Sequence, residues 1–193
     1  MKWDPIHDSR RTFLACLQAQ CAPGIPAGPV PAPGLSHDPA LDTAAAVLLS
    51  LLDPGLTLAL IGPEAGTLSP LYDLTGAAPA DPAEADFVLI SGDPGQVLGT
   101  VRCGDRAHPE TGATVIVTGT ARAGGQDAAS TPVTLAGPGI ETSIQTVLPL
   151  TGPVLRSLEA ANSVPPTGID LLLTGGGVLT ALPRTTQIQM EAA

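Results

Sequence analysis

The chain has 193 residues, of which 44% are hydrophobic and 13% are charged, which suits a single domain spanning residues 1–193. Acidic residues outnumber basic ones by 18 to 8, and the resulting net charge of −10 argues against nucleic-acid or anionic-membrane binding. No apolar stretch is long enough to span a membrane and no secretory signal is visible, so we expect a cytoplasmic protein.

Two helices are predicted in the first quarter of the chain. The segment at residues 4–24 contains the first, because Ile6, Phe13, Leu14, Leu17 and Cys21 recur at helical intervals and the Pro-Gly at residues 23–24 ends the run. The Pro- and Gly-rich residues 25–39 predict an exposed loop. Asp38 is the expected N-cap of the second helix, which ends before the Asp-Pro-Gly at residues 53–55.

The rest of the chain alternates between short strands and helical segments. Continuously apolar strands, typical of burial on both faces, are predicted at residues 56–61, 87–92 and 113–119. The remaining predictions are a helix or helical turn at 94–101, a flexible connection at 121–130, a strand at 132–140, an amphipathic helix at 152–163, a β-hairpin at 169–183 that turns at its glycine triplet, and an edge strand at 185–190. This order predicts an α/β fold, a three-layer α/β/α sandwich with a mixed sheet.

Several classes of enzyme site lack their residues. The glycines at residues 60–66 and 135–140 match neither a dinucleotide-binding nor a Walker pattern, so we interpret them as turns. The single lysine, Lys2, leaves no residue for a Schiff base inside the domain. The three histidines fall in different segments and metal-ligand spacing is absent, so we expect neither a metal nor a cofactor, and the catalytic residues are unknown.

Polar residues gather in the segment before the strand at 113–119, which makes it the leading candidate site. A Cys103–His108 pair is conceivable there, although an inert, half-buried thiol is the simpler interpretation. Arg184 could bind a carboxylate or a phosphate, or lie at the surface or in an interface. The candidate ligand or interface residues are His7, Asp8, Arg11, Arg102, Asp105, His108, Glu110, Thr111, Asp170, Pro183, Arg184 and Thr185. For His7 and Asp8, helix capping is the alternative.

Five ordered motifs resemble the PhnH family, a subunit of the bacterial carbon–phosphorus lyase machinery for phosphonate use. They are HDSRRTFLACLQAQCAPG at residues 7–24, CGDRAHPETGATVIV at 103–117, GPGI at 137–140, NSVPPTGID at 162–170 and ALPRTT at 181–186. The resemblance implies a fold similar to pyridoxal-phosphate-dependent transferases but without the cofactor. It also implies a homodimer that joins PhnG, PhnI and PhnJ subunits in a core complex.

The resemblance further implies a contribution to forming α-D-ribose 1-methylphosphonate 5-triphosphate from ATP and methylphosphonate, in a structural or co-catalytic role, so that whether the chain alone is an enzyme stays open. One alternative is a free-standing homodimeric enzyme or binding protein for phosphonates or sugar phosphates. Its site would be the residue 102–114 loop, joined by Arg184. A second alternative is a decayed pyridoxal enzyme that still binds its cofactor without a lysine.

Overall fold

A computed structural model describes residues 3–118 and 130–190 of the chain, and the connection predicted at residues 121–130 lies almost wholly outside that part. The helices are α1 (His7–Cys21), α2 (Pro39–Leu51), α3 (Pro70–Thr75) and α4 (Gly152–Ala161), with 3-10 turns η1 (Ala65–Leu68) and η2 (Pro109–Thr111). The strands are β1 (Thr57–Ile61), β2 (Ala78–Pro79), β3 (Phe87–Ser91), β4 (Thr114–Thr118), β5 (Thr131–Ala136), β6 (Ile144–Leu148), β7 (Asp170–Thr174), β8 (Leu179–Leu182) and β9 (Gln187–Met190).

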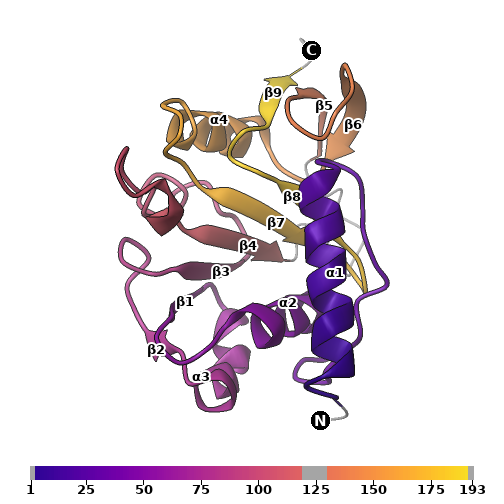
Figure 1. Cartoon of the computed structure of the whole chain (residues 1–193), viewed down its shortest axis with the longest axis vertical. Coiled ribbons are helices and arrows are strands. Elements are labelled where there is room, and N and C mark those ends of the chain that lie inside the picture. Colours follow the sequence, from indigo (N-terminus) through magenta and orange to yellow (C-terminus); the bar gives the residue numbers. More distant parts are fainter. Residues whose placement is uncertain (1–2, 119–129, 191–193) are drawn as a thin grey trace.

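The main sheet has six strands in the order β2-β1-β3-β4-β7-β8 (Figure 1). The first five run parallel, and β8 pairs antiparallel with β7, so the predicted mixed sheet is confirmed. Its central strands are the three continuously apolar runs and the first arm of the predicted hairpin. Parallel strands that are covered on both faces need apolar side chains on both, which explains why these strands do not alternate between apolar and polar residues.

A second, separate sheet has three antiparallel strands in the order β6-β5-β9. The sequence predicted β5 and β9 as strands but not β6, and it did not predict that they leave the main sheet. Val133 and Leu135 of β5 are buried while Pro132 of the same strand is exposed, so only one face of β5 meets the core. One-sided burial is typical of antiparallel sheets, in contrast to the main sheet.

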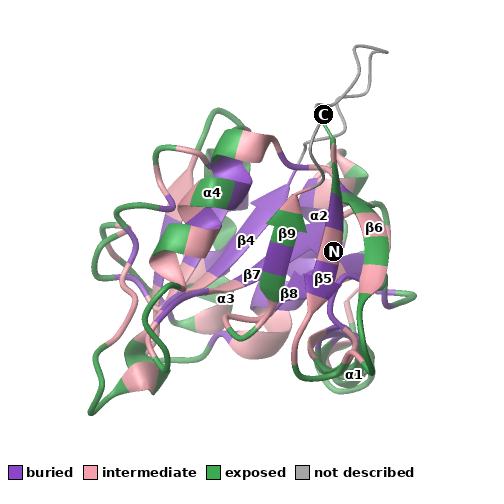
Figure 2. Cartoon of the chain, turned by 90° about the horizontal axis from the view of Figure 1, so that it is seen from above, coloured by how far each residue is buried: buried purple, intermediate pink, exposed green. Residues whose placement is uncertain are grey.

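The main sheet is covered on both faces (Figure 2). One face carries Leu89 and Ile116, which pack in a hydrophobic cluster with α1, α2 and α3. The other carries Val115 and Val117, which pack with α4 and the three-stranded sheet. The prediction of a three-layer α/β/α sandwich therefore needs one correction, because the third layer is a mixture of helix and antiparallel sheet. No helix among residues 3–118 and 130–190 has the length and apolar character that crossing a membrane requires.

Local signals placed most helices correctly. The Asp38 carboxylate accepts hydrogen bonds from the backbone N–H groups of Ala40 (2.7 Å) and Leu41 (3.1 Å), as expected of the N-cap of α2. The six-residue α3 was missed, because so short a helix has little periodicity. Residues 94–101 form helical turns and no regular helix.

The Pro- and Gly-rich segment at residues 25–39 is more tightly held than an exposed loop. Ala27 forms an antiparallel bridge with Leu179 of β8, and the Val30 N–H donates to the carbonyl oxygen of Gly177 at 2.8 Å. Ala27 and Val30 are buried, while their neighbours Pro26 and Pro29 are exposed. The segment therefore follows the edge of the main sheet as an extended strap.

Candidate functional site

The apolar stripe that predicted α1 points to solvent. Ile6 is 73% exposed, Phe13 49%, Leu14 43% and Leu17 50%. The opposite side of α1, which faces the protein, consists of the small residues Thr12, Ala15, Cys16 and Ala19. Small side chains let α1 approach α2 and β8 closely, so that the larger ones are left outside. We call Ile6, Phe13, Leu14 and Leu17 the outer face of α1.

A groove runs beside the outer face. It has a volume of about 470 Å³ and lies between α1 and the strap. Leu14 belongs to both the groove and the outer face, and Arg11 lies on the rim. The Arg11 guanidinium is 3.9 Å from the Asp8 carboxylate, and its side chain is 70% exposed, so this ion pair is weak. Together the outer face and the groove form a surface with an apolar centre and a cationic edge.

Two of the candidate residues, His7 and Asp8, belong to the start of α1. The Asp4 carboxylate accepts hydrogen bonds from the backbone N–H groups of Ile6 and His7, each at 2.9 Å, and these bonds lower the pKa of Asp4. Asp8 accepts in return from the Asp4 N–H at 3.0 Å. Asp4 and Asp8 thus cap the helix reciprocally, which agrees with the capping interpretation.

Arg184 fastens the candidate loop to the sheet. Its guanidinium donates to the Asp170 carboxylate through Nη2 (2.6 Å) and Nε (3.2 Å), and through Nη1 to the carbonyl oxygen of Pro109 (2.5 Å). The side chains of Arg184 and Asp170 are only 17% and 23% exposed. A β-carbon on Gly112 would overlap the carbonyl oxygen of Gly168, so the loop backbone also packs directly against the start of β7.

Arg102 makes a second link between this loop and the sheet, at the neighbouring strands. Its Nη2 donates to the Asp86 carboxylate and its Nε to the carbonyl oxygen of Thr111 at 2.5 Å. Asp86 in turn accepts from the backbone N–H (2.9 Å) and the hydroxyl (2.7 Å) of Thr57. Asp86 and Thr57 therefore link the starts of β3 and β1 to the loop before β4.

The crest of the loop is exposed. The Asp105 carboxylate accepts from the N–H groups of Ala107 and His108, both at 2.7 Å, and these bonds lower its pKa. His108 Nδ1 lies 3.2 Å from Glu110 Oε1, and these side chains are 66% and 69% exposed. Asp105, His108 and Glu110 thus form the outer surface of a loop whose base is held by Arg102 and Arg184.

The candidate residues at the start of α1 lie far from those in and around the loop at residues 102–114. Asp86, Thr114 and Asp170 stand at the amino-terminal ends of parallel strands, so the loop at residues 102–114 lies at that edge of the sheet. Figure 1 shows this loop on the left and α1 on the right, beyond the carboxyl-terminal ends of the same strands. Ligands of α/β sheets usually bind at the carboxyl-terminal edge, the opposite one. Pro183 and Thr185 flank Arg184 in the connection from β8 to β9.

Two of the three cysteines, Cys16 and Cys103, have the properties of unreactive thiols. The Cys103 thiol donates to the carbonyl oxygen of Val101 at 3.6 Å, while His108 faces Glu110, and burial raises the pKa of Cys103. Burial raises the pKa of Cys16 to about 11. Within the described residues, no three His, Cys, Asp or Glu side chains cluster as a metal site would require. The structure thus supports the inert interpretation of Cys103.

The Asp86 carboxylate should make the free energy of unfolding depend on pH in the acidic range. Burial alone would raise its pKa, but hydrogen bonds from Thr57 and Arg102, with the charge of Arg102, lower it overall. A lowered pKa means that the stabilisation is complete above the unfolded value of about 3.9 and is lost as pH falls through the folded value. We expect Asp86→Asn to cost about 1–2 kcal/mol at pH 7 and progressively less below about pH 4.

Urea unfolding followed by circular dichroism between pH 3 and pH 7, roughly the range in which carboxylates titrate, measures this dependence. The matched control is Asp53→Asn, which removes an equal charge from an exposed position after α2. The interpretation is wrong if the difference between wild type and Asp86→Asn stays constant down to the lowest pH.

Sequence reasoning found Arg102, Asp170 and Arg184 but missed two features. It named Arg11 without seeing the outer face beside it, although the large residues of α1 on one side and the small ones on the other were visible signals. It also missed a cavity at the carboxyl-terminal ends of β4 and β7. Asp38 and two residues of the glycine triplet, Gly175 and Gly176, border this cavity. We interpreted Asp38 and the triplet only as structural signals.

Comparison with known proteins gives two matches. A family model described as bacterial phosphonate metabolism protein (PhnH) matches residues 2–189. A protein of Rhizobium meliloti (strain 1021), named alpha-D-ribose 1-methylphosphonate 5-triphosphate synthase subunit PhnH, is 29% identical over 195 residues. The match covers 97% of this chain and 94% of the relative, so the similarity extends across both proteins.

Proposed function

The chain belongs to the PhnH family of bacterial phosphonate metabolism proteins, and from this premise we propose that it is a subunit of a carbon–phosphorus lyase core complex. In that role it contributes, with partner subunits of the PhnG, PhnI and PhnJ types, to forming α-D-ribose 1-methylphosphonate 5-triphosphate from ATP and methylphosphonate. The relative from Rhizobium meliloti bears the name of a subunit of the corresponding synthase.

The outer face of α1 is the observation that carries the proposal of a subunit. Phe13 and Leu17 lie about half exposed one helical turn apart, with Leu14 beside them and the groove beyond. A contiguous apolar patch on a small protein marks an interaction surface, since its exposure to water costs free energy that a partner would recover. We propose that this face contacts another subunit, with Arg11 on its edge facing an acidic group of that subunit.

Co-expression tests this role. The chain should co-purify with its partner subunits when one of them carries the affinity tag. The double variant Phe13→Glu, Leu17→Glu should reduce its recovery at least about tenfold, because two carboxylates would be buried in an apolar contact. Since both side chains point outward, the thermal midpoint of the isolated variant should stay close to that of the wild type.

The matched control is Leu74→Glu on α3, where an apolar side chain 47% exposed lies away from α1. This variant should co-purify like the wild type. Equal recovery of the α1 double variant would show that the outer face is not the contact. A complex that assembles and works equally well without the chain would refute the subunit role itself.

The loop at residues 102–114 provides a second proposed contact. Arg102 and Arg184 act there by positioning, because each already holds a carboxylate and a backbone carbonyl of the same chain. Asp105, His108 and Glu110 on the crest are free to meet a partner subunit or a ligand. The defined conformation of the crest supports a contact there, since the Asp105 carboxylate holds its turn through two hydrogen bonds from backbone N–H groups.

Further proposals concern the state of the chain. We propose that residues 1–193 form one domain, since both hydrophobic clusters pack against the same sheet. We also propose a cytoplasmic homodimer, which sedimentation equilibrium would measure. Finally, we propose a fold related to pyridoxal-phosphate-dependent transferases that has no use for the cofactor, because the single lysine, Lys2, precedes the first element of the fold.

A further inference from the structure

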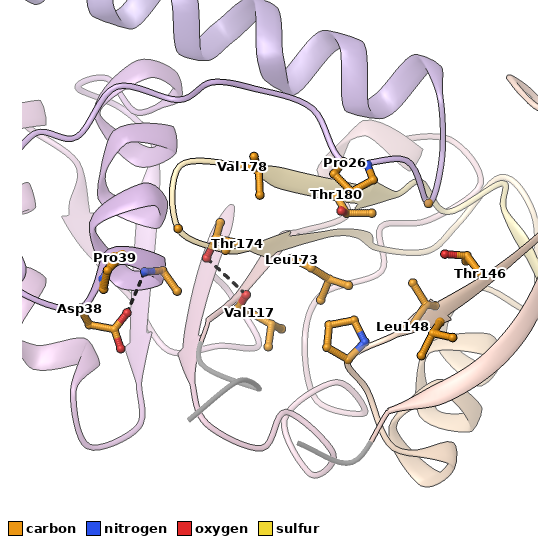
Figure 3. Close-up of a pocket in the computed structure, with 16 residues that line it drawn as sticks. Pro26, Asp38, Pro39, Val117, Thr146, Leu148, Leu173, Thr174, Val178 and Thr180 are labelled. Atoms are coloured by element: carbon orange, nitrogen blue, oxygen red, sulfur yellow. Dashed lines mark hydrogen bonds between the residues drawn. The ribbon is translucent and has the colours of Figure 1, made fainter. Parts of the chain in front are cut away.

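A cavity of about 510 Å³ opens at the carboxyl-terminal ends of the parallel strands. Val117 at the end of β4 and Leu173 at the end of β7 form its floor, and Leu148 of β6 borders it from the second sheet (Figure 3). The volume falls within the range of about 300–1,000 Å³ that is usual for small-molecule sites. Its place, where α/β sheets usually bind ligands, is the edge opposite to the loop at residues 102–114.

The walls of the cavity are fixed by hydrogen bonds of the protein itself. The Thr43 hydroxyl of α2 donates to the carbonyl oxygen of Pro39 (2.8 Å) and accepts from the Gly177 N–H (2.9 Å), which ties the start of α2 to the turn between β7 and β8. The strap is joined to β8 through Ala27 and Leu179. A ligand would therefore meet a largely preformed site, which lowers the entropic cost of binding.

The lining combines apolar surface with a few polar groups. Val178 and Val147, which are 42% and 60% exposed, lie among the lining residues, so the cavity leaves apolar side-chain surface accessible. In Figure 3, Asp38 lies at one end of the group and Thr146 at the other, with Val117, Leu173 and Leu148 between them. Such an arrangement suits a ligand with an apolar body and a polar group at its end.

The charge of the lining limits what the cavity can bind. Asp38 is its single charged side chain among the described residues. Its Oδ1 accepts the two capping hydrogen bonds of α2, and within the described part of the chain Oδ2 has no hydrogen-bond partner. Among the residues that the structure describes, a phosphate or phosphonate group would meet a carboxylate and no cation there. A net charge of −10 adds a field that attracts cations and repels anions.

We propose that this cavity binds a small organic molecule that has an apolar body and a cationic nitrogen group. The nitrogen group donates to Oδ2 of Asp38, and the apolar body lies over Val117 and Leu173. This site is separate from the outer face of α1 and does not depend on the proposed function of the complex. Because of its charge, it is also distinct from any site for a phosphonate or a triphosphate.

Three probes of one shape and different charge test the proposal on the full chain: benzamidine is a cation, benzamide is neutral and benzoate is an anion. We expect benzamidine to bind most tightly in calorimetric titration or saturation-transfer NMR, benzamide more weakly, and benzoate not at all. Asp38→Asn should weaken benzamidine about tenfold and leave benzamide within about twofold, because asparagine keeps the N-cap and removes the charge.

A second variant tests the role of the cavity independently of the charge of Asp38. Val178→Trp should fill the mouth and abolish binding of both benzamidine and benzamide, while Leu74→Trp, a matched exposed position on α3, should not. Benzoate binding as tight as that of benzamidine, or no effect of Asp38→Asn, would overturn the proposal. The proposal would also be overturned if benzamidine did not bind at about 20 mM, because a preformed site should bind it more tightly than that. Loss of partner co-purification in Val178→Trp, without probe binding to the wild type, would instead identify a protein contact.

Discussion

Replacing Arg184 with methionine should lower the free energy of unfolding by about 3 kcal/mol. The guanidinium of Arg184 donates to both the Asp170 carboxylate and the Pro109 carbonyl oxygen, and the Arg184 side chain is only 17% exposed. Methionine keeps most of the side-chain volume but leaves these acceptors without their donor. Removing one partner of a largely buried pair is costly because the other charge remains in a poorly solvated place.

Urea unfolding monitored by circular dichroism gives the free energy, and Arg156→Met is the matched control. Arg156 is exposed on α4, so its replacement should change the stability by less than about 0.5 kcal/mol. A double-mutant cycle with Asp170→Asn isolates the pair, and the loss caused by Arg184→Met should shrink when the Asp170 charge is already absent. A loss as small as that of Arg156→Met would contradict the structural role of Arg184.

The pairing of Arg184 with Asp170 was within reach of the sequence. The predicted hairpin at residues 169–183 is confirmed, and its register places Leu171 opposite Leu182. Asp170 and Arg184 then necessarily stand at the open end of the hairpin, near each other. The bond from Arg184 to Pro109 was out of reach, since 75 residues separate the two and only the packing of β4 against β7 brings them together.

The same distinction explains the errors in the fold. Periodicity predicts that a segment is a strand, as it did for β5 and β9, but the sheet that a strand joins depends on partners far along the chain. For α1 the usual rule, that large apolar residues point inward, gives the wrong face. Phe13 and Leu17 point outward because the inner side needs small residues. The rule describes a single chain, and it would fail in this way if the outer face of α1 contacts another molecule, as proposed above.

Replacing Asp42 with alanine should cost about 3 kcal/mol of stability. Asp42 lies on α2 and is only 5% exposed. Its carboxylate accepts from the N–H groups of Leu35 (2.7 Å), Ser36 (3.1 Å) and Gly34 (3.1 Å), and so holds the end of the strap. Alanine would leave three backbone donors without an acceptor, and each would have to find water or remain unsatisfied.

Asparagine at position 42 is the control that separates hydrogen bonding from volume. Its amide oxygen can still accept from Leu35 and Ser36, while its NH₂ group faces the Gly34 N–H and loses that bond. Asp42→Asn should therefore cost about a third of what Asp42→Ala costs. Hydrogen exchange at Leu35 and Ser36 should accelerate strongly only in the alanine variant. Equal losses in the two variants would mean that the charge of Asp42, and not its three hydrogen bonds, holds the strap against α2.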